Sequence, residues 1–299
     1  MAHDHGRARD YSRAFQLGVA LNLAFVATEA VFGIRARSLA LLADAGHNLS
    51  DVLGLLLAWG ASWLAARRPT KRRTYGMRRS TILAAGVNAI LLLVAVGGIG
   101  WEAVRRLFAP APVAGSTVMG VAAVGVLVNG VTALLFLSGR KRDLNIRGAF
   151  LHMATDAMVS LGVVVAGLTI LLTGWFWLDP VVSLVIALVI TVGTWGLLKE
   201  SLDLAMDAVP EGIDAAAVEA YLAALPGVAA VHDLHIWGMS TAHAALTAHL
   251  VRPAAAIEDG FVAEVCHGLH ARFGIEHSTI QIERGDASHP CNLSPDDVV

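Results

Sequence analysis

The chain has 299 residues, of which 56% are hydrophobic and only 15% are charged. Soluble domains carry about 25% charged residues, so this composition excludes a wholly water-exposed protein. The net charge of −2 does not indicate a class of partner, and no basic stripe interleaved with aromatic residues suggests nucleic acid. Two cysteines, Cys266 and Cys291, are too few for a disulfide framework and favour a reducing compartment.

The first 200 residues contain six apolar segments, each long enough for the roughly 20 residues that a spanning helix needs. They are Ala14–Ile34, Leu39–Ala66, Thr81–Phe108, Ser116–Ser138, Ile146–Thr173 and Trp177–Leu198. Residues 1–13 are polar and lack a signal-type apolar stretch, so the first segment is expected to be retained. The sequence predicts an α-helical polytopic membrane domain of six transmembrane helices over residues 14–200, after an N-terminal arm of residues 1–13.

Basic residues are distributed unevenly between the two sides of this domain. Fifteen Lys and Arg residues lie in the N-terminal arm, the second and fourth connections and just after the sixth segment, against four on the other side. Loops rich in Lys and Arg stay in the cytoplasm. The sequence therefore predicts a multi-pass protein of the inner (plasma) membrane with both termini in the cytoplasm.

The composition becomes that of a soluble domain after about Val209. Helical patterns and strand patterns follow one another at Asp214–Leu225, Val228–Trp237, Ala244–Val251, Glu258–Phe273 and Thr279–Glu283. This α-β-β-α-β order predicts a small cytoplasmic α+β domain over residues 201–285, with its helices on one face of the sheet. The polar residues 286–299 are predicted to form a flexible tail.

Two intramembrane pairs of a histidine and an aspartate have identical spacing. His47 and Asp51 lie in the second segment, and His152 and Asp156 lie in the fifth. Residues i and i+4 share a helix face, so each pair presents one imidazole and one carboxylate side by side. If the two helices face each other, two nitrogens and two oxygens converge in a set that suits tetrahedral Zn²⁺.

Each pair alone could equally be an intrahelical hydrogen bond that lets two polar groups survive burial. The duplication on two helices favours the metal site over that interpretation, because ionisable residues inside a membrane are costly. Asp44 lies three residues before His47, as an outer or entry carboxylate or a group near a helix end, and is not predicted to be a ligand. Glu29 could contribute to a pathway or lie near an interface.

The soluble domain is rich in histidine. By strand alternation, His232 and His235 are expected on opposite faces of one strand. His249 on the next strand could meet His232 across the ladder, and Glu283 on the last strand could complete a second metal site. Solvated surface side chains are the equally weighted alternative. His3, His5 and His289 could form a loose metal-collecting patch with Cys291.

Several motifs together resemble the cation diffusion facilitator family, especially its bacterial-type zinc and cadmium efflux transporters. They are SLALLADAGHNLSD at Ser38–Asp51, RRTYG at Arg72–Gly76, NIRGAFLHMATD at Asn145–Asp156, VHDLHIW at Val231–Trp237 and HSTIQIE at His277–Glu283. The resemblance runs from about residue 13 to 284 and so covers nearly the whole chain.

The resemblance implies a six-helix transmembrane domain, a cytoplasmic domain with a metallochaperone-like (ferredoxin-like) fold, and a homodimer. Matched position by position, it implies a transport site of His47, Asp51, His152 and Asp156. It also implies cytoplasmic metal ligands at His232, His249 and Glu283. In relatives, a His at the first transport position is associated with zinc and cadmium.

The expected function is efflux of a divalent metal cation from the cytoplasm by proton antiport with alternating access. Zn²⁺ is the first expected substrate and Cd²⁺ the second, and Zn²⁺ is also the expected regulatory ligand. His and Asp bind metal only when deprotonated, so metal uptake releases protons. Transport of Co²⁺, Ni²⁺ or Fe²⁺ stays open because ligand type discriminates poorly among these ions, and so does a metal-sensing membrane protein without flux.

Two other classes are disfavoured. An enzyme with a catalytic cofactor is not expected, because the chain lacks an H-E-x-x-H motif and four protein ligands leave no coordination position for water. A channel is not expected, because a saturated site binds too firmly for fast conduction.

Overall fold

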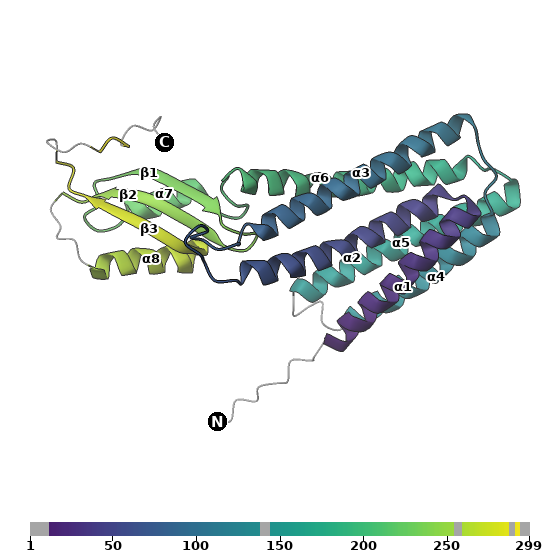
Figure 1. Cartoon of the computed structure of the whole chain (residues 1–299), viewed down its shortest axis with the longest axis horizontal. Helices are drawn as coiled ribbons and strands as arrows, with labels where there is room; N and C mark the ends of the chain where they lie inside the picture. The colour runs from purple at the N-terminus through teal and green to yellow at the C-terminus, as the bar shows by residue number, and fades with distance from the viewer. Residues whose placement is uncertain (1–11, 138–143, 254–258, 287–290, 294–299) are drawn as a thin grey trace, which may run out of the picture. The chain divides into compact units, whose positions relative to one another are not determined.

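The computed structural model describes residues 12–137, 144–253, 259–286 and 291–293, and Figure 1 shows the whole chain. The chain forms two compact units. The first comprises residues 1–56 and 88–195, and the second comprises residues 57–87 and 196–299.

Six long helices occupy the part of the chain for which spanning helices are predicted. They are α1 Ser12–Ala36, α2 Leu39–Ala65, α3 Ser80–Phe108, α4 Gly115–Phe136, α5 Leu144–Thr173 and α6 Leu178–Ala205. In the described part of the chain, four segments are long and apolar enough to cross a membrane: Ser80–Phe108, Gly115–Leu134, Phe150–Thr173 and Leu178–Ala205. The chain thus has a helical transmembrane domain, and α1 and α2 are helices whose described residues do not meet that standard.

The first unit is held together by small residues that let helices approach closely. Figure 1 shows α1 and α4 running side by side, and α4 packs against both α1 and α5. A Cβ added at Gly167 of α5 would lie 2.8 Å from the backbone nitrogen of Met119 in α4. Only glycine fits such a crossing, which is typical of helix packing in membranes. The backbones of α4 and α5 are therefore in direct contact.

The start of α2 is fixed by a carboxylate from another helix. Asp179, in the first turn of α6, accepts hydrogen bonds from the hydroxyl of Ser38 and from the backbone nitrogen of Leu39, the latter at 2.7 Å. Ser38 in turn accepts from the backbone nitrogen of Leu41 at 3.2 Å. The first N–H groups of a helix have no partner within it, so these contacts satisfy buried donors and position α2.

The second unit contains a small mixed sheet, as the α-β-β-α-β pattern predicts. Its elements are α7 Ala215–Ala223, β1 Ala230–Gly238, β2 Ala244–Val251, α8 Asp259–Phe273 and β3 Ile275–Glu283. The strand order is β1-β2-β3, with β1 antiparallel and β3 parallel to β2. Side chains of α7 and α8 form one apolar core with the strands, including Leu222, Leu250 and Leu269. Both helices therefore cover one face of the sheet and leave its other face to polar side chains.

A β-bulge in β1 overturns one prediction from strand alternation. His232 pairs with His249, but His235 pairs with Thr247, so β1 contains one extra residue between them. Asp233 lies at this position with a φ of 51°, a left-handed conformation that Asp tolerates better than most residues. The prediction that His232 and His235 face opposite sides is wrong, because the bulge returns both to the polar face of the sheet.

Candidate metal centres

The side chains of His47 and Asp51 on α2 meet those of His152 and Asp156 on α5. His152 Nε2 lies 3.2 Å from Asp51 Oδ2 and 3.6 Å from Asp156 Oδ2. His47 Nε2 lies 3.5 Å from Asp156 Oδ1 and 3.8 Å from Asp51 Oδ2. Donors of a tetrahedral zinc site with bonds of about 2.0–2.2 Å lie about 3.3–3.6 Å apart. We call these four residues the helix centre. Asp51, His152 and Asp156 offer ligand atoms that all lie within 4.8 Å of one another, whereas His47 lies beside this group, in contact with both carboxylates.

The helix centre contains polar atoms that are buried without a hydrogen-bond partner. Within the described residues these include Nδ1 of His47 and Oδ2 of both Asp51 and Asp156, because His152 Nε2 contacts the two oxygens at 3.2 and 3.6 Å without hydrogen-bond geometry. The side chain of Asp156 is only 2% exposed. A buried carboxylate oxygen without a partner is costly, and a bound cation would remove that cost.

A second polar cluster lies next to the helix centre on α1, α2 and α5. Glu29 is fully buried and accepts a hydrogen bond from Asn48 Nδ2 at 3.4 Å, and Ser160 donates to Asp44 Oδ2 at 3.2 Å. The carboxyl groups of Glu29 and Asp44 also lie close enough to interact electrostatically. Asp44 therefore has partners other than the four residues of the helix centre. Burial also places Glu29 inside the helix packing.

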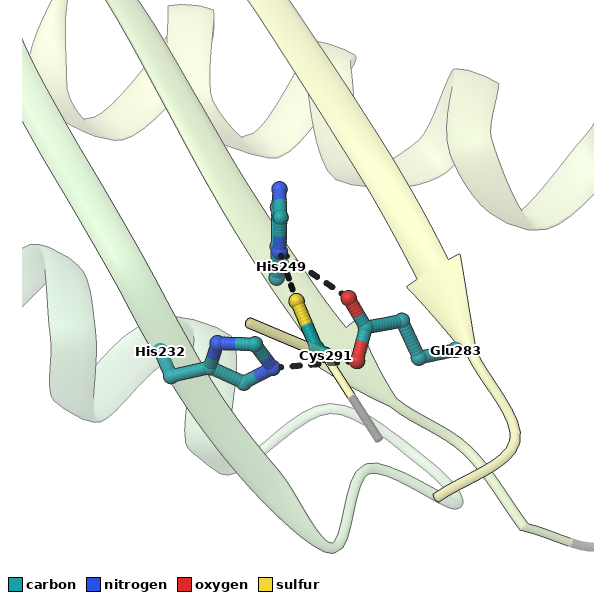
Figure 2. Close-up of side chains that lie close together, drawn as sticks. All are labelled: His232, His249, Glu283 and Cys291. Atoms are coloured by element: carbon teal, nitrogen blue, oxygen red, sulfur yellow. Dashed lines mark hydrogen bonds and ion pairs between the residues drawn. The ribbon is translucent and has the colours of Figure 1, made fainter. Parts of the chain in front are cut away.

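A second group of metal-binding side chains lies on the polar face of the sheet. Figure 2 shows His232 of β1, His249 of β2 and Glu283 of β3 pointing toward one another. His232 Nε2 lies 3.1 Å from Glu283 Oε2, and His249 Nδ1 lies 2.9 Å from Glu283 Oε1. The two imidazoles are 9% and 10% exposed. We call these three residues the sheet centre.

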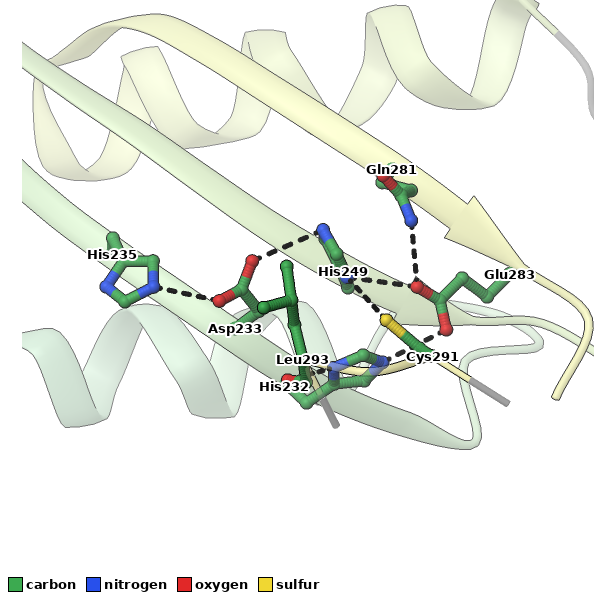
Figure 3. A network of polar contacts seen from close by, with 8 residues as sticks. All are labelled: His232, Asp233, His235, His249, Gln281, Glu283, Cys291 and Leu293. Carbon is green, nitrogen blue, oxygen red and sulfur yellow. Dashed lines mark hydrogen bonds and ion pairs between the residues drawn. The ribbon is translucent and has the colours of Figure 1, made fainter. Parts of the chain in front are cut away.

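The other nitrogen of each of these imidazoles has a partner as well, as Figure 3 shows. His232 Nδ1 lies 3.3 Å from the carbonyl oxygen of Leu293, and His249 Nε2 lies 3.3 Å from Asp233 Oδ2. Asp233 also contacts His235 Nε2 at 2.9 Å. Metal-binding histidines usually donate their second N–H to such an oxygen, which orients the ring.

Cys291 lies beside the sheet centre, with its sulfur 3.6 Å from His249 Nδ1. Partial burial works to raise the pKa of the Glu283 carboxyl, but hydrogen bonds from Cys291 and His232 outweigh it and lower this pKa. A backbone hydrogen bond at Leu293 works to lower the pKa of the Cys291 thiol, but desolvation and the Glu283 carboxylate outweigh it and raise this pKa.

Among the described residues, His235 and His277 belong to neither centre. His277 packs edge-on against the ring of Tyr75 at 5.5 Å between centroids, and His235 contacts Asp233. His3, His5 and His289 lie outside the described residues. The patch predicted for them and Cys291 therefore stays a prediction for the histidines, whereas Cys291 lies at the sheet centre.

Sequence reasoning left three features of these centres unassigned. The proximity of Glu29 and Asp44 could not be predicted from their spacing in the sequence, because the two residues lie on different helices. The bulge at Asp233 could have been suspected from Asp in a strand pattern, where it is depleted. Cys291 follows β3 after residues without periodic pattern, so nothing in the sequence places it over the sheet.

Comparison with known proteins decides the family. Residues 15–204 match the model of the cation efflux transmembrane domain, and residues 210–285 match that of the cation efflux protein cytoplasmic domain. The chain belongs to the cation efflux family. The helix centre falls in the first matched region and the sheet centre in the second.

Relatives align over nearly their full length. The cation efflux system protein CzcD of Alcaligenes sp. (strain CT14) is 36% identical over 98% of this chain and 95% of the relative. The zinc transporter ZitB of Escherichia coli (strain K12) is 35% identical over 98% of this chain and 96% of the relative. A cadmium, cobalt and zinc/H(+)-K(+) antiporter of Bacillus subtilis (strain 168) is 32% identical over 97% and 94%, respectively.

Proposed function

We propose that the chain exports divalent metal from the cytoplasm in exchange for protons, with Zn²⁺ as its first substrate and Cd²⁺ as its second. The observation that carries this proposal is the cluster that two helices form from Asp51, His152 and Asp156, with His47 beside it in contact with both carboxylates. Relatives over the full chain are named for efflux or transport of zinc, cadmium and cobalt, and one is named as an antiporter with protons.

Proton coupling follows from the chemistry of the ligands. An imidazole and a carboxylate bind metal only when deprotonated, so metal entering from the cytoplasm displaces protons from the helix centre. Metal leaves when the centre opens to a more acidic exterior and the same groups regain protons. Each imidazole lies within 4 Å of both carboxylates, so a proton on either ring would be stabilised by an ion pair. The protons that release the metal are thus held by the groups that bound it.

Alternating access requires that the helix centre be reachable from one side at a time. We propose that all six helices α1–α6 span the inner membrane, with both termini in the cytoplasm as the distribution of basic residues predicts. Large apolar side chains on the outer surfaces of these helices, such as Val94, Leu172 and Val192, support contact with lipid. Rocking of helix pairs around the centre is the expected motion.

We further propose that the cytoplasmic domain has a metallochaperone-like (ferredoxin-like) fold, acts within a homodimer and binds Zn²⁺ as a regulatory ligand. His232, His249 and Glu283 would hold this ion. The distances of 3.1 and 2.9 Å from Glu283 to the two imidazoles, and the small exposure of both rings, support a metal site over solvated side chains. Metal held there would report the cytoplasmic concentration to the transport domain.

The test is metal flux into sealed proteoliposomes under an imposed pH gradient. We expect Zn²⁺ and Cd²⁺ to move while Mn²⁺ and Fe²⁺ move more slowly, and metal movement to drive protons in the opposite direction. Asp51→Ala and Asp156→Ala should abolish flux. The exposed Asp203, near the end of α6, provides the matched control, because Asp203→Ala removes a carboxylate outside both centres.

Undiminished zinc flux in both Asp51→Ala and Asp156→Ala would refute the assignment of the helix centre. Zinc binding without flux under any pH gradient would favour the sensor instead. Flux of Co²⁺ or Fe²⁺ above that of Zn²⁺ would keep the mechanism and change the substrate.

A further inference from the structure

The segment Cys291–Leu293 lies across the polar face of the sheet, opposite the helices. Figure 2 shows the sulfur of Cys291 directed into the space between His249 and Glu283. One donor atom from each of His232, His249, Glu283 and Cys291 can be chosen so that all four lie within 4.8 Å of one another. The sheet centre therefore has a fourth candidate donor on its open side.

The spacing of the sulfur agrees with metal coordination. Zn–S bonds of about 2.3 Å and Zn–N bonds of about 2.0–2.1 Å place the two donors about 3.5 Å apart in a tetrahedron. Cys291 Sγ lies 3.6 Å from His249 Nδ1. Little rearrangement is thus needed for the sulfur and this imidazole to share one ion.

Both imidazoles already present the correct nitrogen to such an ion. Nε2 of His232 faces the site while its Nδ1 faces the carbonyl oxygen of Leu293, and Nδ1 of His249 faces the site while its Nε2 faces Asp233. With a metal bound, these outer oxygens would accept the N–H of the far nitrogen of each ring and leave the lone pair of the other nitrogen for the ion. The segment that carries Cys291 also supplies the Leu293 carbonyl, so it contributes to the site twice.

We infer that Cys291 is the fourth ligand of the sheet centre, which becomes a site of two nitrogens, one oxygen and one sulfur closed within a single chain. This inference rests on the proposed regulatory metal site. It adds a fourth ligand to that site and specifies which class of metal ion the site binds. A site with four protein ligands leaves no position for water and retains its metal. The thiolate selects soft or borderline ions such as Zn²⁺ and Cd²⁺ over Mn²⁺ and Mg²⁺.

Cobalt is the probe for this ligand, because thiolate bound to Co²⁺ gives intense near-ultraviolet charge transfer and nitrogen or oxygen ligands do not. The full-length protein in detergent would be titrated with Co²⁺. The chain has two cysteines, and Cys266 on α8 provides the matched control. We expect charge transfer in the wild type and in Cys266→Ser, and its loss in Cys291→Ser.

A second measurement does not depend on any cysteine variant. Asp51→Ala combined with Asp156→Ala removes the helix centre, so that zinc loaded into this variant reports the sheet centre alone. X-ray absorption at the zinc edge should then show one sulfur neighbour at about 2.3 Å.

A zinc shell of nitrogen and oxygen only would overturn the inference, and so would charge transfer that survives Cys291→Ser. Neither result would alter the proposed export function, which proton-coupled flux tests separately. Loss of flux with the sulfur signal intact would instead refute export and leave this site standing.

Discussion

The helix centre and the sheet centre both consist of imidazole and carboxylate side chains. They differ in the hydrogen-bond partners of the imidazole nitrogens that face away from the centre. In the sheet centre, both imidazoles have an oxygen partner for the nitrogen that faces away, namely Leu293 and Asp233. In the helix centre, Nδ1 of His47 is buried and has no hydrogen-bond partner among the described residues. Such outer partners raise metal affinity about 10–100-fold. This difference supports our proposal that the helix centre releases its ion and the sheet centre retains one.

The largest expected effect is the difference in zinc flux between two variants, each of which removes one carboxylate charge from one centre. Asp51→Asn should lower zinc flux by about 100-fold or more at any zinc concentration, because it removes a ligand of the transported ion. Glu283→Gln should keep the maximal flux and shift the zinc concentration that gives half of it. Initial flux measured against zinc concentration distinguishes the two, and equal loss of maximal flux in both variants would contradict the division of roles.

Substitution of Asp233 tests whether the carboxylate that contacts the far nitrogen of His249 accounts for retention of metal at the sheet centre. Asp233→Asn should weaken metal binding at the sheet centre by about 10–100-fold, because the imidazole of His249 loses its charged acceptor. His235→Ala is the control, since His235 contacts the same carboxylate but not the centre. Zinc titration of the full-length protein lacking the helix-centre aspartates would measure this, and similar affinities in the two variants would exclude Asp233 as the determinant.

Stepwise metal removal compares the two centres in one molecule. In the cobalt-loaded wild type, a competing chelator should strip the helix centre first, and the sheet centre should need about tenfold more chelator. The weak visible bands of nitrogen and oxygen ligation should therefore decline before the sulfur charge transfer does. The reverse order of loss would mean that the helix centre holds its ion more tightly.

The smallest expected effect concerns the packing that holds α5 in place. A Cβ at Gly167 would meet the backbone of α4, so Gly167→Ala should destabilise the fold by about 1–3 kcal/mol. Gly162, on the same helix, has no atom within 4 Å of an added Cβ, so Gly162→Ala should be neutral or slightly stabilising. Thermal unfolding in detergent compares the two, and equal midpoints would show that the α4–α5 crossing can adjust.

The helix centre could be predicted from sequence because its geometry is local. An i,i+4 spacing places His47 beside Asp51 and His152 beside Asp156 on any α-helix, so only the meeting of two helices was left to the fold. The order of helices and strands in the cytoplasmic domain was equally accessible, since the period of apolar residues distinguishes helix from strand. Cross-strand pairing of His232 with His249 followed from the same patterns.

Only the tertiary structure decided which side chains complete or support each centre. The bulge at Asp233 turns a side chain that alternation would place in the core toward His249, because one extra residue reverses the face of everything that follows. Glu29 and Asp44 meet through the packing of two helices, and Cys291 reaches the sheet through a segment with no periodic pattern. Short-range spacing therefore determined the principal proposed ligands, whereas contacts between segments distant in the chain determined what surrounds them.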